Sequence, residues 1–175
     1  MKQEKPAFSR SAKTDLIRKF VQRYPVLQSS AFEALAAILD AGREWGRALD
    51  HNLDAYGLSQ GRYFVLLYLF YQEMEGSDSA SPSKIADGLS VTRPTITWLL
   101  DGLERDGFLE RRNDSQDRRA LTVRLTDKGR QFLDEFMPAQ AVRINAAMAN
   151  LDEDERRTLI ALLGKSGLSG PLSPG

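Results

Sequence analysis

The 175-residue chain is predicted to be mainly α-helical with one small β-hairpin, and three observations support this prediction. Apolar residues recur at helical spacing through most of the chain. The pattern changes to strict alternation in two short segments, residues 108–112 and 120–125. Two short helical segments joined by a tight link come directly before this alternation, which is the element order of a winged helix-turn-helix domain.

The N-terminal part of the chain predicts two helices. Residues 1–13 are polar and are expected to be disordered, and residues 14–21 form a short amphipathic pattern that ends before Pro25. A second, longer helical pattern begins at Ser29, and Gly57 is a suitable residue to end it.

A strongly apolar segment over residues 62–70 fits either a buried helix or a strand. Its length and the possible capping residue Ser59 favour the helix. Residues 76–81 are rich in Ser and Gly and predict a loop.

The next two segments, residues 82–89 and 92–105, predict a pair of short helices linked at Ser90 and Val91. One face of the second helix is apolar at helical spacing: Ile96, Leu99, Leu100 and Leu103. Small polar and basic groups stand at its N-terminal end, where a recognition helix enters the major groove of DNA. The candidate DNA contacts on this helix are Thr92, Arg93, Thr95 and Thr97.

The predicted hairpin has a basic tip, and basic side chains there can reach an adjacent minor groove. The candidate contacts are Arg111, Arg112, Arg118 and Arg119. Asp117 lies two residues before Arg119, so in an extended strand its carboxylate could orient that guanidinium.

The C-terminal part predicts two more helices and a tail. One helix begins at about Thr126 and runs to about Asn150. Another begins at Asp152, where Glu155 completes a capping box. Residues 166–175 are expected to be a flexible tail.

Composition excludes several kinds of site. The chain has no cysteine and one histidine, His51, so disulfides, thiol chemistry and cysteine-based zinc sites are excluded, and neither a metal nor a cofactor is expected. No phosphate-binding loop or nucleophile motif is present, which argues against an enzyme. No membrane span or export signal is recognised, so a cytoplasmic protein is expected.

The formal net charge is zero, but the charges are unevenly distributed. Residues 31–81 carry three basic and eight acidic side chains, whereas residues 82–130 carry ten basic and eight acidic ones. The acidic excess could lie on a face away from DNA, so neutrality does not exclude DNA binding.

Four stretches together resemble the MarR family of transcription regulators: residues 83–89, 92–97, 99–111 and 114–129. The family's wing pattern is Asp, any residue and Arg, followed by an alternating strand that ends in Leu-Thr. Asp117 and Arg119 occupy its Asp and Arg positions. The resemblance implies a homodimer that binds palindromic DNA and acts as a repressor.

Within that resemblance, residues 14–57 and 130–165 would form the dimerisation helices and residues 58–129 the DNA-binding domain. The chain departs from the family at Trp98 and Gly102, where many members carry basic residues. Trp98 could contact DNA or pack against the wing. The helix at residues 14–21 is an addition.

The resemblance also implies a small aromatic acid or phenol as effector. Candidate ligand-binding residues combine aromatic walls with cations: Arg43, Trp45, His51, Arg62 and Tyr63. Two alternatives stay open, a winged-helix module that binds proteins and a regulator without a small-molecule switch. A basic wing favours DNA over the protein-binding alternative.

Overall fold

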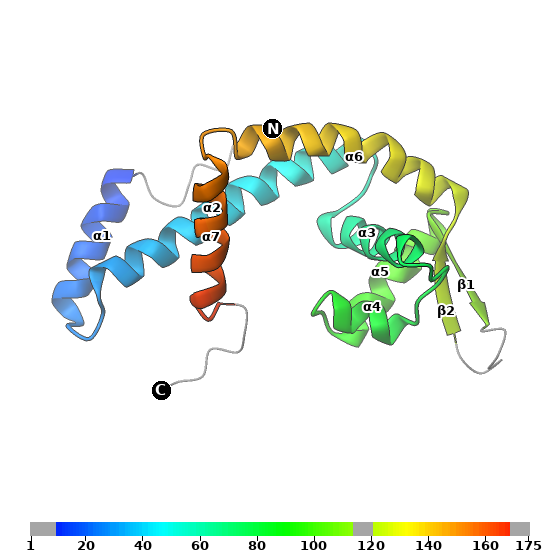
Figure 1. Ribbon diagram of the computed structural model, residues 1–175. Helices are drawn as coiled ribbons and strands as arrows, with labels where there is room; N and C mark the ends of the chain where they lie inside the picture. The colour runs from blue at the N-terminus through cyan, green and yellow to red at the C-terminus, as the bar shows by residue number, and fades with distance from the viewer. Residues whose placement is uncertain (1–9, 114–120, 169–175) are drawn as a thin grey trace. The chain divides into compact units, whose positions relative to one another are not determined.

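A computed structural model describes residues 10–113 and 121–168 of the chain (Figure 1). The elements, in chain order, are α1 (Arg10–Arg23), α2 (Ser29–Asp54), α3 (Gln60–Met74), α4 (Pro82–Gly88), α5 (Arg93–Arg105), β1 (Leu109–Asn113), β2 (Leu121–Leu125), α6 (Asp127–Ala147) and α7 (Glu153–Lys165). They form two compact units, residues 1–63 and 64–175. The predicted fold class is confirmed: the protein is mainly helical with one β-hairpin. The finer domain boundaries drawn from the sequence stay predictions.

The first unit contains α1 and α2, and α1 begins earlier than expected. Residues 10–13 were expected to be disordered but belong to this helix. The Phe20 and Phe32 rings lie 6.0 Å apart between centroids and join α1 to α2. After α2, Gly57 adopts a positive φ of 65°, which is the backbone conformation that a helix-ending glycine supplies.

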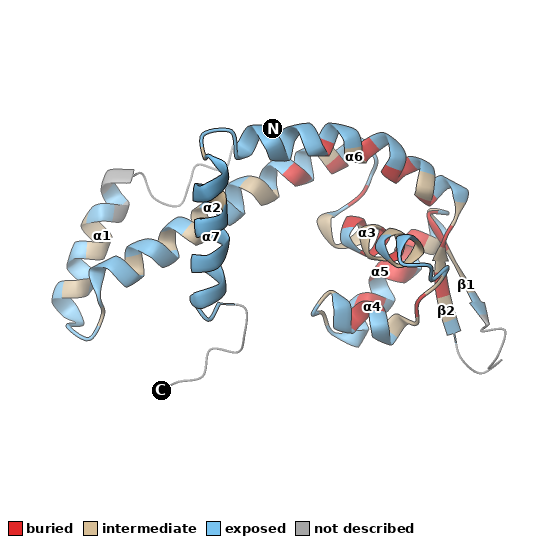
Figure 2. Ribbon diagram, viewed as in Figure 1, coloured by how far each residue is buried: buried red, intermediate tan, exposed pale blue. Residues whose placement is uncertain are grey.

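The second unit has a core to which α3, α4, α5, the hairpin and the first half of α6 all contribute (Figure 2). The apolar segment after Ser59 is a helix, as its length predicted. All four residues of the predicted apolar face of α5 are buried. Several core side chains are less than 2% exposed, among them Leu66, Ile85, Leu100, Leu103, Val123 and Leu133.

The helix pair α4–α5 owes its shape to two caps and one strained residue. The Ser81 hydroxyl accepts a hydrogen bond from the Lys84 amide at 3.3 Å, and Thr92 caps α5 in the same way through the Thr95 amide at 3.4 Å. Between the helices, Ser90 has a positive φ of 54°, which turns the chain sharply. The Val91 amide then donates to the Ala86 carbonyl at 3.0 Å, which closes the turn.

The hairpin pairs β1 with β2 antiparallel, with Arg111 opposite Val123. Val123 also exchanges two main-chain hydrogen bonds with Ala80, at 2.9 and 3.0 Å, so the chain before α4 forms a short bridge to the hairpin. Because Val123 is fully buried, this side of the hairpin faces the core.

The junction between β2 and α6 explains why Leu125 and Thr126 are followed by a glycine at position 129. Thr126 caps α6 by accepting a hydrogen bond from the Gly129 amide at 3.2 Å, and its hydroxyl donates to the Gly107 carbonyl at 2.7 Å. A Cβ added at Gly129 would lie 2.2 Å from the Phe108 carbonyl oxygen, so no larger residue fits without moving the main chain. The start of α6 is therefore held directly against the turn that precedes β1.

The last helix, α7, begins with the predicted capping box. The Asp152 carboxylate accepts from the Glu155 amide at 2.9 Å, and the Glu155 carboxylate accepts from the Asp152 amide at 2.9 Å. No residue of α7 is buried, which sets it apart from α5.

Candidate nucleic-acid interface

The exposed side of α5 carries the predicted contact residues. Thr92, Arg93, Thr95 and Thr97 are all exposed, while the opposite face of the helix is buried. The Thr92 and Thr95 hydroxyls lie 2.8 Å apart, and the Thr97 hydroxyl donates to the Arg93 carbonyl at 3.0 Å. A hydroxyl has one donor and two acceptor positions, so each of these threonines can still take a partner from DNA.

Arg93 is the cation in this group. Within residues 10–113 and 121–168, no carboxylate forms an ion pair with its guanidinium. An exposed arginine at the first turn of a helix can make two parallel hydrogen bonds to the O6 and N7 atoms of guanine.

Trp98 lies on the same outward side of α5 and is 65% exposed. Gly102, the second position at which the chain departs from the family pattern, is buried. The outward side of α5 thus presents one large aromatic ring, Trp98, with the threonines and Arg93 near the start of the helix and the exposed Arg105 at its end.

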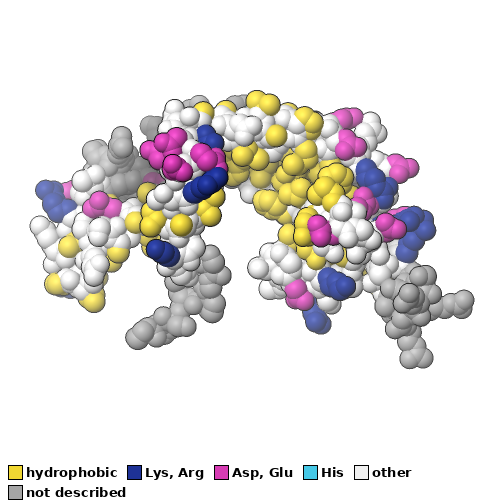
Figure 3. All heavy atoms as spheres, viewed as in Figure 1, with side chains coloured by type: hydrophobic (Ala, Val, Ile, Leu, Met, Phe, Trp, Pro, Cys, Tyr) yellow, Lys and Arg dark blue, Asp and Glu magenta, His cyan; other side chains and the backbone are white. Residues whose placement is uncertain are grey.

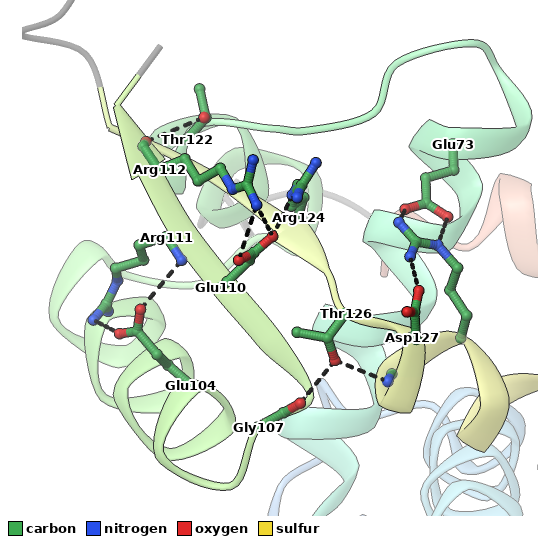
Figure 4. A network of polar contacts seen from close by, with 12 residues as sticks. Glu73, Glu104, Gly107, Glu110, Arg111, Arg112, Thr122, Arg124, Thr126 and Asp127 are labelled. Carbon is green, nitrogen blue, oxygen red and sulfur yellow. Dashed lines mark hydrogen bonds and ion pairs between the residues drawn. The ribbon is translucent and has the colours of Figure 1, made fainter.

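Arg112 extends from the outer side of the hairpin. Its guanidinium lies 3.1 Å from a Glu110 carboxylate oxygen, and its side chain is 56% exposed. Arg124, directly opposite Glu110 in the register, pairs with the same carboxylate (Figure 4). Hydrogen bonding from Arg124, with a smaller contribution from Arg112, lowers the pKa of Glu110. One carboxylate thus holds two cations near the wing.

Arg111 lies on the other side of the strand and does not extend outward as expected. Its guanidinium pairs with Asp101 at 2.6 Å and with Glu104 at 2.8 Å, both on α5. Figure 4 shows the contact with Glu104. Its side chain is 22% exposed. Side chains alternate between the two faces of a strand, so Arg111 and Arg112 face opposite ways. The two arginines therefore do not form one basic patch, although the sequence suggested that both contact DNA.

The other three wing residues, Asp117, Arg118 and Arg119, lie outside the described residues. The two strands lead to this segment from Asn113 and return from it at Leu121. Their contacts with DNA stay predictions.

The five ligand candidates differ in exposure and in the partners they contact, and their role in ligand binding stays a prediction. Arg43 and Trp45 lie about 200° apart around α2, and the Arg43 guanidinium pairs with Asp40. His51 is exposed, whereas Tyr63 is 4% exposed and its burial raises the pKa of the phenol. Arg62 is partly buried.

A cleft of about 410 Å³ lies between α1 and the start of α2. It is lined by seven residues, none of which is a ligand candidate: Thr14, Ile17, Arg18, Val21, Gln22, Ser29 and Glu33. Arg18 and Lys19 both pair with Asp15. The hydrogen bond from Lys19, and to a smaller extent that from Arg18, lowers the pKa of Asp15.

Sequence reasoning missed the partners that hold the hairpin. Asp101 and Glu104 are spaced three residues apart on α5, so they lie on one side of the helix, and this spacing was a usable signal. A second pair was not recognisable from spacing: Arg130 makes a two-pronged ion pair with Glu73, at 3.0 and 2.7 Å, across 57 residues (Figure 4). It fixes the start of α6 to the end of α3.

Two more observations concern the part of the chain that the structure describes. In residues 10–113 and 121–168, no three acidic, histidine or cysteine side chains are grouped so that they could hold a metal ion. Among the helices of the same described ranges, none combines the length and the apolar character that a membrane crossing requires.

The comparisons with known proteins agree with this geometry. The family model described as the MarR family matches residues 58–121. The chain is 31% identical over 148 residues to the HTH-type transcriptional repressor YetL of Bacillus subtilis, covering 85% of this chain and 87% of YetL. It is 28% identical to the transcriptional regulator PecS of Dickeya dadantii, covering 87% of this chain and 90% of PecS.

Solved structures have the same fold. The S. aureus MepR–DNA complex is 25% identical with a TM-score of 0.66, covering 77% of this chain and 94% of MepR. A mutant E. coli MarR complexed with operator DNA is 24% identical, also with a TM-score of 0.66, covering 83% of this chain and 96% of that protein. The chain therefore belongs to the MarR family of winged-helix, DNA-binding transcription regulators.

Proposed function

We propose that this regulator is a repressor that binds a palindromic operator as a homodimer. In this proposal α5 enters the major groove and the hairpin tip reaches the adjacent minor groove. The observation that carries it is the division of α5 into two faces, one buried and one exposed with Thr92, Arg93, Thr95 and Thr97. Repression is supported by the similarity to YetL, which is a transcriptional repressor.

The homodimer is supported by apolar side chains that this chain leaves exposed on its C-terminal helices. Figure 3 shows hydrophobic side chains at the surface of α6 and α7. The exposed set on α7 is Leu159, Ile160, Leu162 and Leu163, and on α6 it includes Val142 and Ile144. A second copy of the chain, related by a twofold axis, would cover such a face with the same face of its own.

The test is selection of bound duplexes from a random DNA pool, followed by footprinting. The proposal expects an inverted repeat whose half-sites are centred about 10 bp apart, because twofold-related recognition helices enter successive major grooves on one side of the DNA. A selected site without dyad symmetry contradicts it. The protein-binding alternative predicts no enrichment above random duplex.

A small aromatic acid or phenol as effector is the finer part of the proposal. Its candidate contacts are Arg43, Trp45, His51, Arg62 and Tyr63. Coupling of about 1–3 kcal/mol would weaken DNA binding about 5- to 150-fold, and by linkage DNA would weaken ligand binding by the same factor. Titrating salicylate with and without operator measures both sides. Equal affinity in the two titrations identifies a ligand that does not regulate.

A further inference from the structure

Three side chains join the hairpin to α5, and we name them the wing clamp: Arg111, Asp101 and Glu104. The two Glu104 carboxylate oxygens have different partners in β1. One accepts the Arg111 main-chain amide at 3.2 Å and the other accepts the Arg111 guanidinium at 2.8 Å. Asp101 accepts from the second guanidinium nitrogen at 2.6 Å.

The charges of the wing clamp do not favour a phosphate contact. Two carboxylates surround one guanidinium, so the formal charge of the group is −1. The Arg111 Nε atom is buried as well. The Asp101 side chain is 58% exposed, so a phosphate that approaches Arg111 would be repelled by this carboxylate. It would find no unpaired cation there among the described residues.

The wing clamp fixes the orientation of β1 relative to α5, because Glu104 binds the main chain of Arg111 as well as its side chain. If only the guanidinium were bound, the Arg111 side chain could change its rotamer and keep the ion pair while the hairpin moved. The bond from the Arg111 amide to Glu104 removes that freedom, since it positions the strand itself against the helix. The tight turn at Gly107, with a φ of 78°, joins the two clamped elements by a short path.

We propose that the wing clamp sets the position of the hairpin relative to α5, so that both fit the DNA at once, and that Arg111 is a positioning residue. This inference rests on the proposed function of α5 and the wing as the DNA-binding surface. Groups held in the bound geometry beforehand do not have to be ordered on binding, so a loosened clamp weakens affinity for DNA.

The test compares two variants, Glu104→Gln and Glu110→Gln, in each of which one carboxylate is made neutral. The proposal expects them to change the affinity for DNA differently. Glu104→Gln keeps the size of the side chain but turns one clamping oxygen into an amide donor that repels the guanidinium. Removing a negative charge near DNA should strengthen binding, yet the proposal expects Glu104→Gln to weaken binding to the selected operator by about fivefold or more.

Glu110→Gln is the matched control. It also removes one carboxylate and releases two arginines, Arg112 and Arg124, but Glu110 has no bond to α5 among the described residues. Its binding is expected to be equal to that of the wild type or tighter. Anisotropy titrations at one salt concentration measure both variants, and circular dichroism checks that each is folded.

A second arm uses Arg111→Ala with and without Glu104→Gln. If Arg111 acts through the clamp, the double variant binds no more weakly than Glu104→Gln alone. If Arg111 contacts a phosphate, the double variant loses further affinity and the slope of log K against log salt falls by about one. Asp101→Asn, which leaves the main-chain bond intact, is expected to show a smaller loss and replaces Glu104→Gln if that variant does not fold.

The outcomes separate the two proposals. If Glu104→Gln binds as well as or better than the wild type, as Glu110→Gln does, the wing clamp is overturned while DNA binding stands. If the wild-type protein selects no operator at all, the proposed function fails first, before any variant is measured.

Discussion

The helices α5 and α7 have the same length of 13 residues and similar apolar content, but they bury very different amounts of surface. In α5, Ile96, Leu99, Leu100 and Leu103 are 6% exposed or less. In α7, Leu159, Ile160, Leu162 and Leu163 range from 37% to 70% exposed (Figure 2). The difference teaches that the winged domain completes its core within one chain, whereas the apolar side chains of α7 stay exposed in a single chain.

The largest expected effect comes from the buried side of this comparison. Leu100→Ala removes a side chain that is 0% exposed, so we expect the free energy of unfolding to fall by about 2–5 kcal/mol. Urea denaturation followed by circular dichroism measures it. A loss well under 1 kcal/mol would mean that the α5 core is not closely packed.

The exposed side is tested with Ile160→Asp. Ile160 is 70% exposed in one chain, so a charge there costs little in a monomer but is buried without a partner in a dimer. We expect the dimer dissociation constant to rise about 100-fold, which sedimentation measures. Thr158→Asp is the control, because position 158 lies about 200° from position 160 around the helix. Equal dissociation constants for all three proteins would place the dimer contact elsewhere.

A smaller effect distinguishes two arginines of the DNA-binding region. Arg93→Ala should reduce operator affinity by about 1–3 kcal/mol and relax preference at one base pair. Arg112→Ala should weaken specific and random duplex alike and lower the salt slope by about one. Competition titrations with single-base operator variants compare them. If both losses are independent of sequence, α5 is not the helix that reads the bases.

The smallest effect concerns Glu110, which is exposed in the hairpin. Its ion pairs with Arg124 and Arg112 lower its pKa in the folded protein. A lowered pKa stabilises the fold above the unfolded pKa of about 4.3, and the stabilisation is lost as the pH falls through the folded value. We therefore expect wild type to be slightly more stable than Glu110→Gln at pH 7, and the difference to be smaller near pH 3. Thermal denaturation at the two pH values measures it.

Local patterns predicted the helical boundaries well because capping is a short-range interaction. Thr92 and Asp152 cap α5 and α7 through amides three residues later in the sequence. The start of α1 was predicted less well, at residue 14 instead of Arg10, because the polar residues before it have no apolar period to mark a helix. Helix ends without a cap or a period are not encoded locally.

The sequence by itself determined the order of the elements, the buried face of α5 and the family, since each depends on spacing along the chain. Only the tertiary structure decided which of the wing's arginines are paired within the chain and which are exposed. Arg111 and Arg112 are neighbours of the same type, yet one is held by Asp101 and Glu104 and the other is 56% exposed. The physical reason is that an ion pair depends on distance in space, and folding brings a carboxylate from α5 to one face of β1 and leaves the other face to Glu110.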